Sequence, residues 1–225
     1  MTIDTSLTLA DDGLRLSESV YESLLEAILT GKLAAGQPVS ELALTRRLGV
    51  SRTPVHEAVR QLIHDGLVVQ QANCRPVVAQ YSSEAIHEVF EMRKILEGES
   101  AYRAALLIDR VTLSSLRQVA DRLGEANRGK AWIRRWADFD ERFHADIAAC
   151  CGLDRLAQDV GRYRRLHRFF NRVHTTCEVL NQALAEHVAI LDALERRDPD
   201  KARAAMVNHI QQWQKYFVQQ IETEA

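Results

Sequence analysis

The segment Ser40-Glu-Leu-Ala-Leu-Thr-Arg-Arg-Leu-Gly-Val-Ser-Arg-Thr-Pro-Val-His-Glu-Ala-Val-Arg-Gln-Leu-Ile-His-Asp-Gly66 determines the fold of the first third of the chain. Ser40 has a side chain that is preferred at a helix N-cap, and Gly49 suits the position just after a helix, so a short helix is expected over residues 41–48. Ser51 is a second N-cap residue only two positions later. This spacing leaves a tight turn between two helices.

The second helix of this segment is predicted over residues 53–65. Pro54 lies in its first turn, where a missing N–H does no harm, and Gly66 ends it. A short helix, a Gly-Val-Ser turn and a second helix together predict a helix-turn-helix over about residues 41–60. Its second helix would offer its N-terminal residues to the major groove of DNA.

The flanking residues complete a winged helix. An apolar stripe at helical spacing, followed by a loop with Gly and Pro, predicts a first helix over residues 17–33. Downstream, residues 67–71 and 76–79 are typical of two short strands around a polar tip. Three helices and a hairpin predict a winged helix-turn-helix domain over residues 15–80. A flexible segment, residues 1–14, precedes it and lacks the features of a signal peptide.

The rest of the chain has no strand signal. Apolar residues recur at helical spacing in six segments separated by Asp, Gly, Thr or Pro, and such segments can bury their apolar faces only against one another. The fold is therefore predicted to be mainly α, with an antiparallel all-α helical bundle over residues 83–223. The six expected helices cover residues 83–107, 111–128, 131–151, 153–174, 177–197 and 199–223.

Composition excludes several other classes. The 225 residues are 46% hydrophobic and 27% charged, and only 10 Gly and 4 Pro leave little material for a turn-rich β-sandwich. No apolar run approaches the roughly 20 residues of a membrane-spanning helix, so no membrane partner is expected. Four Cys without CxxC spacing favour a reducing cytoplasm.

The distribution of charge along the chain is more informative than its total. The net charge of −2 does not indicate binding to nucleic acid. Residues 46–75, however, hold five Arg against two acidic residues, and this local excess of positive charge can face phosphate.

The helix-turn-helix segment resembles the DNA-binding domain of the GntR family of bacterial transcription regulators, and its run Leu-Gly-Val-Ser-Arg-Thr-Pro-Val is close to that family's signature. The helical part, with Glu91-Met-Arg-Lys-Ile-Leu-Glu97 and Asp140-Glu-Arg-Phe-His144, resembles the FadR-type (FCD) domain, which implies ligand binding and dimerisation. Six helices rather than seven are typical of its VanR-like branch. Two departures stand out: His56 stands where the family usually has Arg, and the wing tip lacks the usual Gly.

The resemblance implies that the start of the second helix of the helix-turn-helix contacts DNA. Arg52 would read a base edge such as guanine O6 and N7, which an Arg side chain can grip with two hydrogen bonds. The hydroxyl residues beside it would contact phosphate or base, and the two arginines before the turn would hold the DNA backbone. The six predicted DNA-contacting residues are Arg46, Arg47, Ser51, Arg52, Thr53 and His56.

A second group of residues has the composition of a metal site. Asp140 and His144 are four residues apart, so both project from one helix face, a spacing that lets two side chains share one ion. His187 and His209 lie on consecutive helices at similar distances from the turn between them, so they come level if those helices are antiparallel. A carboxylate and three imidazoles suit a divalent transition metal ion, Zn²⁺ first, with Ni²⁺ or Mn²⁺ as alternatives. All four residues match ligand positions in the metal-binding members of the FadR-type group.

Arg93 is the predicted effector-binding residue, because a guanidinium can pair with the free oxygens of a carboxylate held at the metal. An ion pair with Glu97 at i,i+4 explains Arg93 equally well. His167 and His174 also share one helix face, but they match no ligand position and are expected to be solvated or at a pocket rim.

Together these features predict a non-enzymatic, cytoplasmic transcription regulator, in the simplest case a repressor. It would bind a double-stranded DNA operator as a homodimer and respond to a small carboxylate effector at the metal. One alternative is a mononuclear metalloenzyme with an appended nucleic-acid module, since an open metal site can activate water. Against it, no Glu stands beside the ligands as an obvious general base in the way that an HExxH motif provides one, and Glu141 points off the ligand face. A further alternative is a regulator whose metal is purely structural or is itself the effector.

Overall fold

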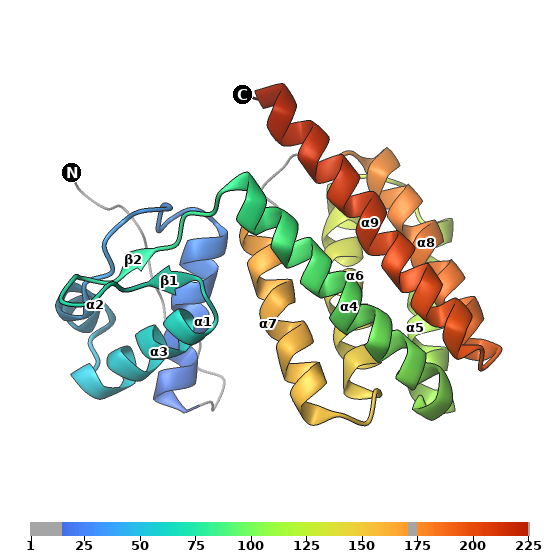
Figure 1. The fold of residues 1–225 in the computed structure, drawn as a ribbon, viewed down its shortest axis with the longest axis horizontal. Helices are drawn as coiled ribbons and strands as arrows, with labels where there is room; N and C mark the ends of the chain where they lie inside the picture. Colours follow the sequence, from blue (N-terminus) through green and yellow to red (C-terminus); the bar gives the residue numbers. More distant parts are fainter. Residues whose placement is uncertain (1–14, 171–174, 225) are drawn as a thin grey trace. The chain divides into compact units, whose positions relative to one another are not determined.

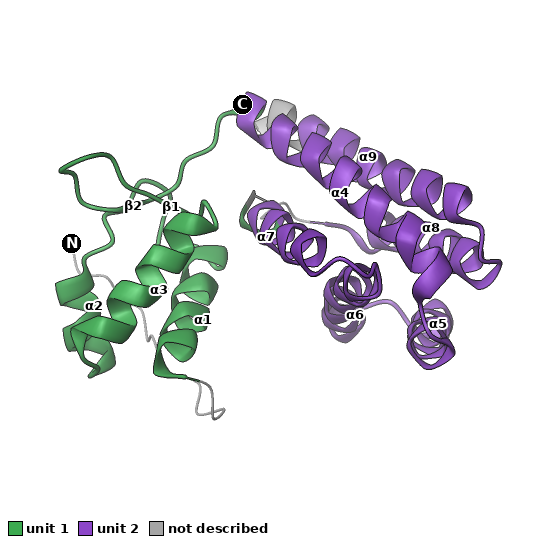
Figure 2. Ribbon diagram, turned by 60° about the horizontal axis from the view of Figure 1, so that its bottom comes forward, with its two compact units in different colours: residues 1–83, 168–172 green, residues 84–167, 173–225 purple. Residues whose placement is uncertain are grey.

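The computed structural model describes residues 15–170 and 175–224, so the predicted flexible segment over residues 1–14 lies outside the described residues. The described part of the chain forms nine helices and one two-stranded sheet, which confirms the predicted mainly α fold (Figure 1). Its residues divide into two compact units, residues 15–83 with 168–170 and residues 84–167 with 175–224 (Figure 2).

The first unit is a winged helix-turn-helix, as predicted. Ser40 Oγ accepts a hydrogen bond from the backbone N–H of Ala43 and caps the second helix, which Gly49 ends in the left-handed conformation with φ of 67°. Glycine adopts this conformation without steric cost. The elements are α1 (Leu16–Leu29), α2 (Glu41–Leu48), α3 (Arg52–His64), β1 (Val68–Val69) and β2 (Val77–Val78).

Two details of this unit differ from the prediction. Helix α1 ends at Leu29 rather than residue 33, because Gly31 turns the backbone into the left-handed region with φ of 77° and the N–H of Leu33 then bonds back to Ala27 O. Ser51 occupies the N-cap position of α3, but its side chain makes no capping hydrogen bond. The Ser51 side chain is exposed at the start of the helix.

Helix α1 packs against α3 through buried apolar faces. At about 1.5–3 kcal/mol for each large side chain removed from water, this packing holds α3 firmly. Tyr21 Oη also donates a 2.6 Å hydrogen bond to Asp65 Oδ2, directly after α3. The opposite face of α3 therefore remains available to solvent. The buried residues are Val20, Leu24 and Ile28 of α1 and Val55, Val59 and Leu62 of α3.

The wing is shorter than predicted. Its two antiparallel strands pair Val68 with Val78 and Val69 with Val77, and each strand has two residues rather than the expected five and four. At the tip, Asn73 takes the left-handed conformation with φ of 60°. Asn tolerates this conformation better than most residues, so the hairpin turns without the Gly that the family usually has there.

The second unit is the predicted helical bundle (Figure 2). Helix α8 packs against α9 and α5, and α6 packs against α5 and α8. Its core is rich in aromatic side chains, among them Phe90, Trp132, Phe139 and Phe143. The helices are α4 (Ser83–Leu107), α5 (Arg110–Glu125), α6 (Lys130–Ala149), α7 (Asp154–Phe170), α8 (Cys177–Glu195) and α9 (Pro199–Glu224).

None of the described helices combines the length and the apolar character that crossing a bilayer requires. All four cysteines are free thiols.

Candidate metal centre and candidate DNA-binding surface

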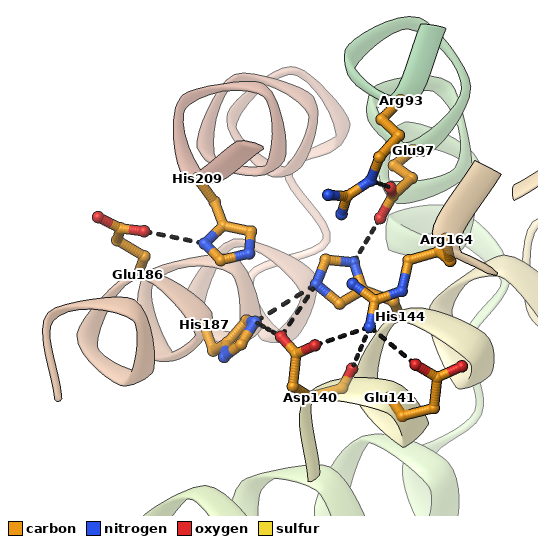
Figure 3. Close-up of polar contacts among 9 residues, drawn as sticks. All are labelled: Arg93, Glu97, Asp140, Glu141, His144, Arg164, Glu186, His187 and His209. Atoms are coloured by element: carbon orange, nitrogen blue, oxygen red, sulfur yellow. Dashed lines mark hydrogen bonds and ion pairs between the residues drawn. The ribbon is translucent and has the colours of Figure 1, made fainter. Parts of the chain in front are cut away.

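The structure brings the four predicted metal ligands together inside the second unit (Figure 3). Asp140 and His144 come from α6, His187 comes from α8 and His209 from α9. One ligand atom from each residue lies within 4.8 Å of the corresponding atoms of the other three. The three histidines are buried, and the Asp140 side chain is 17% exposed.

The nitrogen and oxygen atoms of this cluster face one another. His187 Nε2 lies 3.3 Å from Asp140 Oδ1 and 3.4 Å from His144 Nε2, and His144 Nε2 lies 3.6 Å from the same Asp140 oxygen. The rings of His187 and His209 are 4.5 Å apart, which confirms that the two residues come level on α8 and α9. His187 Nε2 and His144 Nε2 face each other with at most one proton between them, so at least one of the two nitrogens has a lone pair directed into the cluster.

Two glutamates stand behind the histidines, and the sequence interpretation assigned neither of them to the cluster. Glu186 Oε2 accepts a 2.8 Å hydrogen bond from His209 Nδ1. Glu97 Oε2 lies 2.5 Å from His144 Nδ1. A carboxylate at Nδ1 favours the tautomer with its proton on that nitrogen, so Nε2 keeps its lone pair and points inward. Metal-ligating histidines are commonly oriented in this way.

Arg164 of α7 fixes the carboxylate of the cluster. Its Nη2 atom lies 2.7 Å from Asp140 Oδ2 and 3.2 Å from Glu141 Oε2 (Figure 3). Burial by itself raises the pKa of Asp140, but the positive charge of Arg164 is the largest of the effects that outweigh burial, so this pKa lies well below its ordinary value. Asp140 is therefore ionised near neutral pH, while its other oxygen, Oδ1, faces the histidines.

Two histidines of the cluster, His187 and His209, are held in the neutral form that metal ligands need. Burial, reinforced by the neighbouring His209, lowers the pKa of His187 from 6.5 to about 4. Burial also lowers the pKa of His209, more than its bond to Glu186 raises it. Three imidazole nitrogens and one carboxylate oxygen in a buried cluster fit a divalent transition metal ion.

Arg93 and Glu97 form the ion pair that the i,i+4 spacing allows. Arg93 Nε donates a 2.6 Å hydrogen bond to Glu97 Oε1, and both side chains are buried. Burial by itself raises the pKa of Glu97, but the positive charge of Arg93 is the largest of the effects that outweigh burial and hold this pKa well below its ordinary value. The pair leaves Arg93 Nη1 buried and without a hydrogen-bond partner among the described residues. A buried guanidinium N–H without an acceptor is costly, which favours an anionic ligand beside it.

The expectation that His167 is solvated or at a pocket rim is wrong. Its side chain is buried, with the residue 7% exposed, between the rings of Phe90 and Trp213. Burial, followed by the charges of Arg93 and Arg164, lowers the pKa of His167 well below its ordinary value. The abundance of Arg on α7 was misleading, because Arg164 on the same helix is itself buried. His174 lies outside the described residues.

The predicted DNA-contacting residues lie on the first unit. At the start of α3, Ser51, Arg52, Thr53 and His56 are exposed, and at the end of α2 Arg46 is exposed while Arg47 is half-buried. Within the described part of the chain, Arg46, Arg47 and Arg52 form no ion pair, so no acidic side chain there neutralises their charges. His56 differs, because its Nδ1 lies 3.0 Å from Glu41 Oε1.

A winged helix joined to a helical domain with a buried Asp/His cluster defines a class of two-domain, DNA-binding regulators. Comparison with family models agrees. Residues 16–73 match the model for bacterial regulatory proteins of the gntR family, and residues 88–212 match the FCD domain. The chain belongs to the GntR family of transcription regulators, with an FCD domain in its helical part, and it is a regulator rather than an enzyme.

Individual relatives agree with this assignment. The "HTH-type transcriptional repressor RspR" of Escherichia coli (strain K12) is 28% identical over 219 residues, covering 94% of this chain and 92% of RspR. The "Probable D-xylose utilization operon transcriptional repressor" of Paenarthrobacter nicotinovorans is 27% identical over 201 residues, covering 87% of this chain and 85% of that protein. The solved structure of E. coli McbR/YncC has a TM-score of 0.75 at 20% identity, over 92% of this chain and 99% of that chain, which supports the fold.

Proposed function

We propose that this protein is a cytoplasmic, homodimeric repressor whose binding to a DNA operator is controlled by a small organic acid at a metal centre in the FCD domain. The observation that carries the proposal is the buried cluster of Asp140, His144, His187 and His209, with glutamates behind two of the histidines. Repression rather than activation is supported by two relatives that are named as repressors.

Asp140, His144, His187 and His209 would hold the metal ion, with Zn²⁺ as the first expectation and Ni²⁺ or Mn²⁺ as alternatives. When bound, a divalent ion of this kind supplies a strong positive charge and further coordination positions for carboxylate oxygens. The chain supplies the orientation, because Glu186 and Arg164 hold His209 and Asp140, and the carboxylate of Glu97 lies beside His144 Nδ1.

Arg93 is suited to bind the free oxygen of the effector. Its Nε already bonds Glu97, which holds the guanidinium in place, and the unpaired Nη1 atom remains to donate to an anion. Glu97 also contacts His144 Nδ1. An effector bound to Arg93 would therefore act on the Arg93–Glu97 ion pair, and through Glu97 on the orientation of His144. This coupling offers a physical route from effector binding to the arrangement of α4 and α6.

DNA recognition is assigned to the exposed start of α3. Arg52 would read base edges, Ser51 and Thr53 would contact base or phosphate, and Arg46 and Arg47 would hold the phosphate backbone. A homodimer would present two such helices to the half-sites of a pseudo-palindromic operator, so a change in the helical domains could alter their spacing.

Fluorescence anisotropy on DNA from the upstream intergenic region of the gene tests this function. The wild-type protein should bind one duplex with nanomolar affinity, and a carboxylic acid from a panel should shift that affinity only when metal is present. His187→Ala should keep operator binding and helical circular dichroism but lose the effector response. His87→Ala is the matched control, because His87 is an exposed histidine of the same unit.

Each other outcome points to a different function. Loss of helical structure in His187→Ala supports a purely structural metal, and a response to the ion without any acid makes the metal itself the effector. An effector response that persists in protein stripped of metal contradicts the proposed site. Binding that is no tighter than to random DNA contradicts operator recognition.

A further inference from the structure

His56 is an unusual residue for the recognition surface on α3. Its side chain is 57% exposed and lies one turn after Arg52, so both residues share the face that the proposed function turns toward DNA. The family usually has Arg here, which can only donate hydrogen bonds. A His side chain can also accept one, and the structure indicates which of its nitrogens does so.

Glu41 determines the proton position on His56. The carboxylate is at the first position of α2, and its Oε1 atom lies 3.0 Å from His56 Nδ1. An ionised carboxylate can only accept hydrogen bonds, so Nδ1 must carry the proton in this contact. In a neutral imidazole the other nitrogen then has a lone pair. Glu41 is the only hydrogen-bond partner of His56 among the described residues, so Nε2 remains available as an acceptor.

We propose that His56 reads the operator as a hydrogen-bond acceptor, through Nε2, and selects a base that presents an amino group in the major groove. Cytosine N4 and adenine N6 are the amino groups exposed there, whereas guanine presents only acceptors at its major-groove edge. Guanine on the contacted strand would place an acceptor against an acceptor, so the same geometry rejects the base that an Arg at this position would favour. Glu41 is the positioning residue, since it acts through His56. The inference rests on operator recognition by α3.

Selection of duplexes from a random pool, followed by sequencing, tests this inference for wild-type protein, His56→Ala and His56→Arg. The selection is done at about pH 8, because readout by an acceptor nitrogen requires a neutral imidazole. We expect one position in each half-site to prefer cytosine or adenine in the wild type. His56→Ala should reduce that preference about fivefold, the usual effect of one hydrogen bond, and His56→Arg should convert it to guanine. All other positions should stay unchanged.

Two variants of Glu41 separate proton placement from charge. Glu41→Gln keeps an oxygen that can accept a hydrogen bond from Nδ1–H, but its amide group can also donate to Nδ1, so this variant should retain part of the preference. Glu41→Ala removes that acceptor, so the His56 proton can lie on either nitrogen. Guanine should then compete with cytosine and adenine at this position. Overall affinity for DNA can rise in the same variant, because a negative charge has been removed, without affecting this test. Because His56 and Glu41 are surface residues, circular dichroism should show that all the variants keep the fold.

The results that overturn the inference are specific. A guanine preference in the wild type, an unchanged motif in His56→Ala, or an unchanged motif in Glu41→Ala would each contradict acceptor readout while leaving operator recognition intact. If the wild type enriches no motif at all, operator recognition itself fails, and the inference fails with it.

Discussion

The metal-free protein should lose stability when the pH falls from 7 to 5, because its helical domain buries neutral histidines. His187 has a pKa of about 4 in the fold, against an ordinary value of 6.5. Between these values the unfolded chain binds a proton that the folded chain does not, so acid favours unfolding. The stability contributed by neutral His187 is complete above about pH 6.5 and is lost as the pH falls toward 4.

The size of this effect follows from the same two values. Comparing pH 7 with pH 5, His187 alone should lower the free energy of unfolding by about 2 kcal/mol. His167 and His209 also have lowered pKa values and shift stability in the same direction. Asp140 and Glu97 contribute mainly below this window, since their ordinary pKa values are 3.8 and 4.5. The interval from pH 7 to pH 5 therefore reports chiefly on histidines.

Urea unfolding followed by tryptophan fluorescence measures this effect, with a chelator present. All three tryptophans, Trp132, Trp136 and Trp213, lie in the second unit, so the signal reports on the helical domain. His187→Asn removes the titrating group and should reduce the difference between pH 7 and pH 5 by about 2 kcal/mol. Equal free energies of unfolding for the wild type at the two pH values would refute the reasoning, as would a pH dependence that His187→Asn leaves unchanged.

Three further predictions follow from named contacts. Glu186→Gln should weaken metal binding roughly 10- to 100-fold with the fold retained, since Glu186 orients His209; unchanged affinity in a metal titration would contradict that role. Leu62→Ala should destabilise the winged helix by about 2–5 kcal/mol in urea denaturation, because Leu62 is fully buried, and a loss under 1 kcal/mol would count against the assigned core. Arg52→Ala should weaken operator binding about 5- to 150-fold in anisotropy, whereas the exposed Arg110→Ala of the helical domain should not.

The helices could be predicted from the sequence because their caps and apolar spacing are local features. Ser40 and Gly49 bound α2 where their chemistry indicates, and the six helices of the bundle begin and end within a few residues of the expected positions. The end of α1 was harder to predict, because the apolar pattern continues past Leu29 while Gly31 already turns the backbone. The length of the two wing strands depends on how they pair with each other, which the local sequence pattern does not predict.

The four clustered residues could be selected from spacing and resemblance, but their surroundings could not. Glu186 is the neighbour of His187 in sequence, yet it bonds His209 on the next helix. Glu97 was recognised as a partner of Arg93, while its contact with His144 depends on the packing of α4 and α6. His167 shows the opposite error, since a polar helix composition concealed a buried face. Contacts between helices determine which polar residues are buried, and these contacts cannot be read from the periodicity of a single helix.

Metal stoichiometry tests the central claim most directly. Wild-type protein, stripped with a chelator and titrated with Zn²⁺ in a calorimeter, should bind one ion per chain. The double variant His144→Ala/His209→Ala should lose that binding, and His87→Ala should keep it. No binding by the wild type, or equal binding by the wild type and the double variant, would contradict a metal centre at this cluster.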